Sequence, residues 1–389
     1  MLPSATLAVS GRAKALKRAG RPVIELSAGE PDFPTPEPVS QAGIRAIEEG
    51  YTTYTANPGM PELREAIAEW LAATYGVTYS ADDILCSNGA KQSVAQALLV
   101  ALCPGDEVLI PAPYWVSYPE MVRLAGAQPV VVPTTPEDGY RLAPDRLAAA
   151  LTEKTRALIL NSPSNPTGAI YSPAELEALA AVLRDHPNVL VISDEIYSQV
   201  VYDAEHIAFA SLEGMFDRTV TVNGFSKAYA MTGWRLGYLA GPSWLVKAAS
   251  KVQGQLTSAP STITQKAGLA ALQMDHEPVR QMVRAFRERR DFVLSSLAQL
   301  PGVQCPRPEG AFYVFPDFSS YFGTTTPAGQ KVDGSEALCF YLLEEHHVAL
   351  VPGEAFGAPY GVRISYAAGM DDLREAMCRI DVGLAALRR

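Results

Sequence analysis

The run Ser226–Arg235 contains residues whose types and spacing indicate a specific chemistry. Lys227 stands between small residues, and Arg235 follows it eight positions later, after a short glycine-containing turn. A lysine in a tight, partly apolar turn can lose its proton near neutral pH and attack a carbonyl to form a Schiff base. The arginine offers a planar set of donors for a phosphate. The pair suggests a site for a phosphorylated aldehyde, against the plainer interpretation of Lys227 as a surface lysine.

Polar side chains also follow two other apolar segments. Asp194 ends the apolar run Val189–Asp194, and a fixed carboxylate keeps a pyridine nitrogen protonated, although an aspartate there often caps a helix instead. Asn165 lies in a turn made rigid by two prolines, and its amide can donate to a phenolate-like oxygen. Tyr197, three residues after Asp194, could share that oxygen or simply be a packing tyrosine. An amine, a carboxylate and a phosphate clamp together indicate pyridoxal phosphate.

The turn Ser87–Lys91 is a candidate for binding the phosphate. Gly89, Ala90 and Lys91 open a predicted helix, whose free N–H groups and positive dipole end favour an anion. The signal is weak by itself, since many helices start in this way. The chain has neither a G-x-x-x-x-G-K-[ST] run nor a G-x-G-x-x-G run, which argues against a nucleotide.

Short apolar strands alternate with amphipathic helices through the middle of the chain. This pattern predicts an α/β fold with a largely parallel sheet covered by helices on both faces. Ligands of such sheets bind at the carboxyl ends of the strands, where Asn165, Asp194 and Lys227 fall. Glu195 should point to the other side of its strand. The strands are expected at 84–86, 107–111, 128–132, 155–161, 189–194 and 219–223, and the helices at 90–102, 118–125, 143–151 and 174–186.

The pattern changes after residue 280. An arginine-rich helix is expected over 277–300, followed by short strands at 311–315, 348–351 and 362–365, with helices at 334–345 and 371–387. We therefore predict a large domain over residues 31–280 and a smaller α+β domain over 281–389. Residues 1–30 are expected to form an N-terminal arm that packs with the small domain.

Composition limits the classes of partner. The 389 residues carry 32 Lys and Arg against 42 Asp and Glu, a net charge of −10, which argues against nucleic acid and anionic membranes. The five cysteines are an odd number, widely spaced and without a C-x-x-C pair, so we expect no metal site and buried free thiols. The N-terminus lacks the pattern of a signal peptide. These features predict a cytoplasmic enzyme.

The chain resembles the class I aminotransferases of the aspartate aminotransferase superfamily, which are pyridoxal-phosphate enzymes of fold type I. Matching motifs run through nearly the whole chain in order, and they resemble most the bacterial branch that acts on aspartate and 2-oxoglutarate, some members also on prephenate. The motifs are Pro3–Thr6, Ala28–Phe33, Tyr54 with Pro58-Gly59, Pro113–Tyr118, Asn165–Gly168, Asp194–Tyr197, Ser226–Arg235 and Arg363–Tyr366. The resemblance implies a large domain with a mostly parallel seven-stranded sheet flanked by helices, plus a smaller α+β domain.

The resemblance also implies a role for each matching residue. Lys227 would form the Schiff base and carry the proton, while Asp194 would pair with the ring nitrogen. The ring would contact Asn165, Tyr197 and Trp115, and the phosphate would contact Gly89, Ala90, Lys91 and Arg235. Arg363 and the Gly29 backbone would bind the substrate α-carboxylate, although a strand arginine can also serve a surface ion pair. Tyr54 would reach the phosphate of a neighbouring subunit, so the expected form is a homodimer with shared active sites.

Substrate choice is less determined. The segment Gly254–Pro260, where animal-type relatives place an arginine for the distal carboxylate, contains none. The resemblance gives that task to Lys91 with help from Thr6. Relatives active on prephenate often carry a basic residue where this chain has Leu2, so we expect weak or absent prephenate activity.

Several alternatives remain open. The same fold could carry an aromatic, alanine, kynurenine or prephenate aminotransferase, or a carbon–sulfur β-lyase. A non-enzymatic regulator that binds pyridoxal phosphate is a more distant alternative, since such proteins usually add a basic DNA-binding domain. A catalytically inactive homologue is disfavoured because every expected chemical position is filled.

Overall fold

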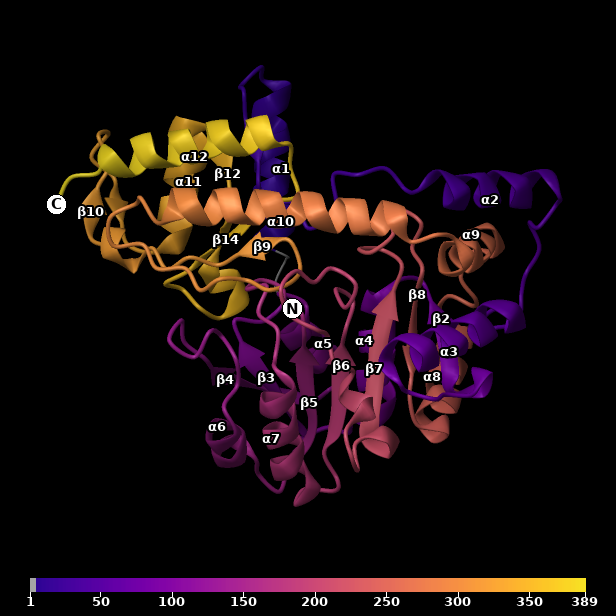
Figure 1. Ribbon diagram of the computed structural model, residues 1–389. Coiled ribbons are helices and arrows are strands. Elements are labelled where there is room, and N and C mark those ends of the chain that lie inside the picture. The colour runs from indigo at the N-terminus through magenta and orange to yellow at the C-terminus, as the bar shows by residue number, and fades with distance from the viewer. Residues whose placement is uncertain (1–4) are drawn as a thin grey trace.

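A seven-stranded sheet forms the centre of the larger part of the molecule (Figure 1). The computed structural model describes residues 5–389, and residues 5–8 by their backbone alone. The strand order is β2-β8-β7-β6-β5-β3-β4, and β8 alone of the seven runs antiparallel to both of its neighbours. The strands are β2 (Ile84–Ser87), β3 (Glu107–Ala112), β4 (Gln128–Pro133), β5 (Thr155–Asn161), β6 (Leu190–Asp194), β7 (Thr219–Gly224) and β8 (Gly237–Ala240). The predicted mostly parallel, helix-flanked sheet is confirmed.

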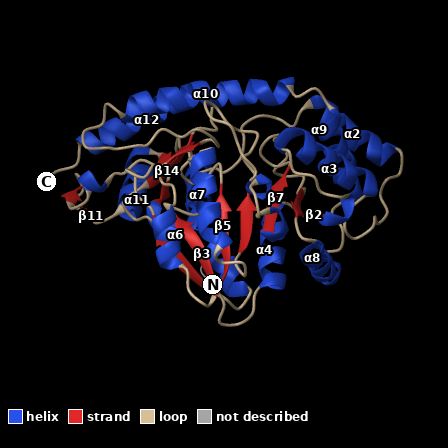
Figure 2. Cartoon of the chain, turned by 60° about the horizontal axis from the view of Figure 1, so that its bottom comes forward, coloured by secondary structure: helices blue, strands red, loops and turns tan. Residues whose placement is uncertain are grey.

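Side-chain alternation along the central strands divides the core between the two faces of the sheet. Val108 and Ile110 pack with the helices of one face, whereas Leu109, between them, packs on the other. Both faces are therefore covered by helices, as Figure 2 shows. One face carries α4 (Ala90–Ala101), α5 (Tyr118–Leu124) and α8 (Ser243–Leu256), and the other carries α6 (Pro144–Ala150) and α7 (Pro173–Arg184). Burial on both faces explains why these strands read as continuous apolar runs.

Local signals in the sequence fix the ends of several helices. Ser172 accepts a hydrogen bond from the Glu175 backbone, and the Glu175 side chain accepts one from the Ser172 backbone, which together cap α7. Pro173 occupies the first turn, where its missing N–H is harmless.

At the edge of the sheet next to β2 lie α2 (Glu37–Glu48), α3 (Pro61–Tyr75) and α9 (Thr262–Gln273), which pack on one another.

A second core lies above the sheet in Figure 1, around the long helix α10 (Glu277–Leu297). Its sheet has the order β13-β14-β9. The other elements there are β9 (Tyr313–Val314), β10 (Thr324–Thr325), β11 (Lys331–Val332), α11 (Ser335–His346), β12 (Val348–Ala349), β13 (Val351–Pro352), β14 (Val362–Ser365) and α12 (Met370–Ala385). The single strand predicted over 348–351 is wrong, because the chain changes sheets at Leu350 and gives β12 and β13.

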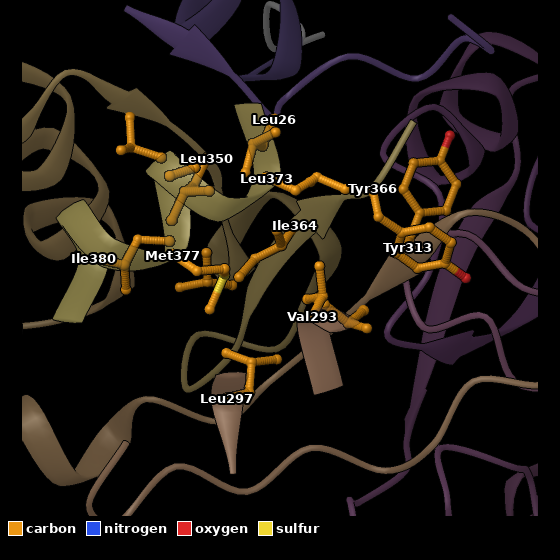
Figure 3. Close-up of a cluster of buried hydrophobic side chains, with 14 of the residues drawn as sticks. Leu26, Val293, Leu297, Tyr313, Leu350, Ile364, Tyr366, Leu373, Met377 and Ile380 are labelled. Atoms are coloured by element: carbon orange, nitrogen blue, oxygen red, sulfur yellow. The ribbon is translucent and has the colours of Figure 1, made fainter. Parts of the chain in front are cut away.

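The N-terminal arm joins this second core. Strand β1 (Ile24–Glu25) pairs in parallel with β12, and helix α1 (Ala5–Arg18) contacts β12 and β13. Leu26 is fully buried in the cluster that Figure 3 shows, beside Leu350 and Ile364. These contacts join residues 5–26 to the second core, and the division of the chain into an arm and two domains at residues 30 and 280 stays a prediction.

The prediction that all the cysteines are buried is wrong. All five thiols are free, and Cys86 and Cys339 are buried, but Cys103 and Cys378 are exposed. Cys103 lies in the turn after α4, and Cys378 lies on the outer face of α12, so apolar neighbours in sequence do not place them in the core.

Leu26→Ala should lower the free energy of unfolding by about 2–5 kcal/mol, because it removes a fully buried side chain from a packed cluster. Denaturant unfolding of the purified protein measures the change. Leu124→Ala removes the same atoms from a side chain that is 54% exposed and should change stability by about 0.5 kcal/mol or less. Equal losses in the two variants would contradict the proposed packing of the N-terminal arm.

Candidate active site

A cavity of about 560 Å³ lies where β5, β6 and β7 end, beneath the second core. The carboxyl ends of these three parallel strands face the cavity, and sheets of this kind bind their ligands at that edge. The lining includes ten of the residues singled out from the sequence: Gly29, Ala90, Lys91, Trp115, Asn165, Asp194, Tyr197, Lys227, Arg235 and Arg363. Residues far apart in the sequence therefore meet in one site.

Lys227 is held in a turn directly after β7. Its ammonium donates to the carbonyl of Gly29, which belongs to the N-terminal arm. Desolvation inside the cavity, with a contribution from the nearby Arg363, lowers the pKa of Lys227 to about 8. A substantial fraction of the amine is consequently neutral near physiological pH, and only the neutral amine can attack a carbonyl or accept a proton.

Asp194 ends β6 and is 4% exposed. Its carboxylate accepts hydrogen bonds from the Tyr118 hydroxyl (2.7 Å) and from the Ile196 N–H (3.3 Å). Burial raises the pKa of Asp194 to about 6, despite the two donors, so the carboxylate is ionised at neutral pH. Its position is therefore fixed and its charge is poised for a cationic partner in the cavity.

Tyr118 was not recognised as a site residue from the sequence. It lies within the quoted Pro113–Tyr118 motif, at the start of α5, and its ring meets Trp115 edge to face at 5.3 Å. The hydroxyl reaches Asp194 from a helix 76 residues earlier in the chain. Only the packing of α5 on the sheet shows that contact.

Glu195 points away from the cavity, as strand alternation predicted. It is completely buried behind the sheet, where it accepts hydrogen bonds from the Ser193 hydroxyl and the Phe209 N–H and pairs with His206. Neighbouring acidic residues at one strand end thus have different surroundings.

The start of α4 and Arg235 lie side by side, at the corner where the sequence predicts a phosphate. The N-cap Gly89 has φ +89°, and a Cβ there would collide with the Arg235 guanidinium. A Cβ on Gly237 would likewise collide with the Ala90 backbone. Arg235 donates to the carbonyls of Thr232 (2.9 Å) and Asn88 (3.2 Å), which aims it at the helix start. Glycine at both positions therefore allows the backbone and the guanidinium to converge.

Arg363 on β14 is 2% exposed and forms the opposite wall. It donates to the Asn165 side chain (3.0 Å) and the Ser27 carbonyl (2.6 Å), and its Nε has no partner among the described residues. The guanidinium lies 4.6 Å from the Tyr313 ring, whose hydroxyl is 2.8 Å from that of Tyr197. A buried, partly unpaired guanidinium is suited to bind a carboxylate.

Tyr313 is a second residue that the sequence did not reveal. It lies in β9, within a predicted strand but outside every quoted motif, and it is completely buried. Tyr313, Tyr197 and Arg363 belong to three separate segments of the chain and meet only in the folded structure. No pattern in the sequence predicts that these three side chains lie together.

Lys91 and Trp115 form another wall. The ammonium lies 4.9 Å from the centre of the Trp115 ring, a distance at which a cation is attracted to the ring face. Partial burial, and then the charge of Arg235, lowers the pKa of Lys91. The lysine thus contributes a positive charge to the cavity as well as standing at the helix start.

Of the predicted site residues whose side chains or backbone the structure describes in full, Gly89 and Tyr54 do not line the cavity. Tyr54 is 96% exposed and does not line it. Thr6 lies in α1, but its side chain is outside the described part of the structure. The proposed roles of all three therefore stay predictions.

The lowered pKa of Lys227 predicts a distinctive pH profile of chemical labelling. Reductive methylation of the cofactor-free protein, followed by peptide mapping, should label Lys227 with a midpoint near pH 8, compared with about 10.4 for a free lysine side chain. The exposed Lys247 serves as the reference in the same digest. A midpoint of Lys227 above pH 10 would contradict the desolvated environment.

Comparison with known proteins gives the family. The model of aminotransferases of class I and II matches residues 21–380. The chain is 54% identical to an aspartate aminotransferase of Pinus pinaster, over 99% of this chain and 80% of that protein. It is 50% identical to an aspartate/prephenate aminotransferase of Cereibacter sphaeroides, over 99% and 97%.

A solved structure of aspartate aminotransferase from Rhizobium meliloti agrees with the fold. It superposes with a TM-score of 0.96 at 46% identity and covers 100% of this chain and 97% of that one. The half-buried lysine and the buried carboxylate and guanidinium described above thus lie in a fold that aminotransferases share. The chain belongs to the family of class I and II aminotransferases.

Proposed function

We propose that this chain is an aspartate aminotransferase that transfers the amino group of L-aspartate to 2-oxoglutarate by a ping-pong reaction, giving oxaloacetate and L-glutamate. The observation that carries the proposal is the meeting of Lys227, Asp194 and Arg363 in one cavity. A reactive amine, a buried carboxylate and a carboxylate-binding guanidinium are the groups that transamination of an amino acid requires.

Pyridoxal phosphate is the cofactor that these residues fit. The glycine-lined corner at the start of α4 suits a phosphate, and the unpartnered Nε of Arg363 leaves a donor for a carboxylate beside it. When bound, the cofactor carries the amino group and withdraws electrons from the substrate α-carbon. The residues proposed to hold it are Lys227, Asp194, Asn165, Tyr197, Trp115, Gly89, Ala90, Lys91 and Arg235.

The chain's own side chains then have separate tasks. Arg363 binds and orients the substrate α-carboxylate, with the Gly29 backbone beside it. The neutral Lys227 amine accepts the α-proton and later returns it, which its pKa of about 8 permits near neutral pH. Asp194 keeps a negative charge at the floor of the cavity, held by Tyr118. The distal carboxylate of aspartate is assigned to Lys91, with help from Thr6.

Removing either central group should abolish most of the activity. Lys227→Ala deletes the nucleophile and the base together, and Asp194→Ala deletes the fixed negative charge, so each should lower kcat by at least about 10³-fold. Initial rates with aspartate and 2-oxoglutarate measure the loss, and Lys247→Ala is the control for an exposed lysine. Borohydride reduction with pyridoxal phosphate should label Lys227. Retention of more than a few per cent of the activity, or a label at another residue, would refute the assignment.

A homodimer is also part of the proposal. Tyr54 is 96% exposed, and large apolar side chains of the same region are exposed as well: Ile44 (46%), Ile47 (56%) and Leu256 (63%). Association through this region would bury that surface and bring Tyr54 to the phosphate corner of the other subunit.

Sedimentation of the purified protein should give twice the 41.8 kDa mass of the chain. Tyr54→Ala should weaken the binding of pyridoxal phosphate about tenfold, as expected for the loss of one hydrogen bond to a charged group, without changing the unfolding of the cofactor-free dimer. A stable monomer with full activity would exclude shared sites.

Prephenate should be a poor substrate. Leu2, which lies outside the described residues, stands where relatives with this activity often carry a basic residue. Initial rates with aspartate, glutamate, alanine and phenylalanine as amino donors and with prephenate as an amino acceptor test this expectation and the aspartate preference together. A sulfur-containing amino acid, scored for pyruvate plus thiol, tests the β-lyase alternative. Comparable rates with prephenate and oxaloacetate as amino acceptors would overturn the expected weak prephenate activity. A preference for alanine or phenylalanine as the amino donor would overturn the aspartate preference.

No helix among the described residues is long and apolar enough to cross a bilayer. A cytoplasmic location stays a prediction from the sequence, and fractionation of the cells that produce the protein would test it. Detection of the protein outside the cytoplasmic fraction would contradict it.

A further inference from the structure

Helix α1 supplies a wall of the cavity on which the proposed reaction leaves two residues, Ser10 and Lys14, without a role. Val9, Ala13 and Leu16 join α1 to a small apolar cluster of the second core. Ser10 and Lys14 are four residues apart, hence on one face of the helix, and both line the cavity. The apolar face therefore anchors α1, while the polar face is turned to the substrate space.

The charges that line the cavity are unequal. Lys14, Lys91, Lys227, Arg235 and Arg363 contribute positive charge, and Glu25, Glu30 and Asp194 contribute negative charge. The proposed reaction uses Arg235 for the phosphate, Arg363 for the α-carboxylate and Lys227 for proton transfer. It assigns Lys91 to one distal carboxylate and leaves Lys14 unassigned.

Glu25 does not neutralise Lys14. Its carboxylate accepts a hydrogen bond from the Ser10 hydroxyl (2.7 Å) and lies 3.7 Å from the ammonium of Lys17, one turn farther along α1. Within residues 5–389, no hydrogen bond or ion pair to Lys14 occurs. Among the described residues, its ammonium is therefore a cation without a carboxylate partner, on an exposed side chain at the cavity wall.

The two substrates of the reaction place different demands on that wall. The α-carboxylate at Arg363 and the α-carbon at Lys227 have fixed positions, so they are the same for both substrates. The five-carbon acid is one methylene longer than aspartate, and its distal carboxylate must extend farther from Arg363. A site that serves both needs either a mobile cation or a second one.

We propose that Lys14 is a specificity-determining residue that binds the distal carboxylate of the five-carbon substrates, glutamate and 2-oxoglutarate, whereas Lys91 serves the four-carbon pair. The inference rests on the proposed function. Lys91 projects from α4 on the sheet, and Lys14 projects from α1 on the second core, so the two cations approach the substrate from different parts of the molecule. The flexible lysine stem lets the ammonium follow a longer substrate.

Lys14→Gln tests the proposal in the holoenzyme. In single half-reactions, the variant should lower kcat/KM for glutamate about tenfold, because one charge-assisted hydrogen bond to the substrate is lost. The change should come mainly from a higher KM. The kcat/KM for aspartate should fall less than about threefold, and that for alanine should not change, because alanine has no distal carboxylate. Competition should show the same split, with weaker binding of glutarate and nearly unchanged binding of succinate.

Arg18→Gln is the matched control, since it removes one positive charge from the same helix outside the cavity. It should behave as the wild-type protein in every assay, and Lys14→Arg should restore the binding of glutarate. Equal losses for glutamate and aspartate in Lys14→Gln, or no loss for either, would overturn the role of Lys14. A wild-type protein that turned over neither dicarboxylate would instead refute the proposed function, so the two failures can be told apart.

Discussion

The site depends on charged side chains held out of water with incomplete pairing. Asp194 and Arg363 are 4% and 2% exposed, and Lys227 shares their cavity. Burying an ionised group is costly unless it is paired and hydrogen-bonded. The protein offsets part of the cost through Tyr118, Asn165 and the Ser27 carbonyl. The charge that remains unpaired can pair with a cation or a carboxylate that enters the cavity.

The same desolvation makes the lysine chemically useful. A lysine with its ordinary pKa would be almost fully protonated at neutral pH, whereas burial brings the pKa of Lys227 to about 8. Burial raises the pKa of Asp194 to about 6, yet leaves it ionised at that pH. The same environment thus moves the pKa values of Lys227 and Asp194 toward 7, while Asp194 stays ionised at neutral pH.

The arrangement of the two cores gives each group its position. The sheet holds Asp194 and Lys227 at the ends of adjacent strands, and β14 of the second core holds Arg363 opposite them. The N-terminal arm closes the gap, since the Ser27 and Gly29 carbonyls accept hydrogen bonds from Arg363 and Lys227. An arm that is remote in sequence from both groups therefore helps to fix the Arg363 guanidinium and the Lys227 amine relative to each other.

Much of this could be read from the sequence because the signals are local. Continuous apolar runs gave the parallel strands within one or two residues, and a polar residue at each strand end marked the cavity. Short motifs marked Lys227, Asp194 and Arg363. Strand β8 was missed, since four residues that include two small ones, Gly237 and Ala240, carry little periodicity. The break at Leu350 was missed because the apolar pattern continues through it.

The sequence by itself determined the fold class and the family and predicted a reactive lysine at Lys227, because periodicity and motif chemistry depend on neighbouring residues. Only the tertiary structure decided that Tyr118 holds Asp194, that Tyr313 supports Tyr197 and Arg363, and that Lys14 faces the cavity. Each of these relations joins segments far apart along the chain. Such contacts, and the pKa values that follow from burial, exist only after the two cores have packed.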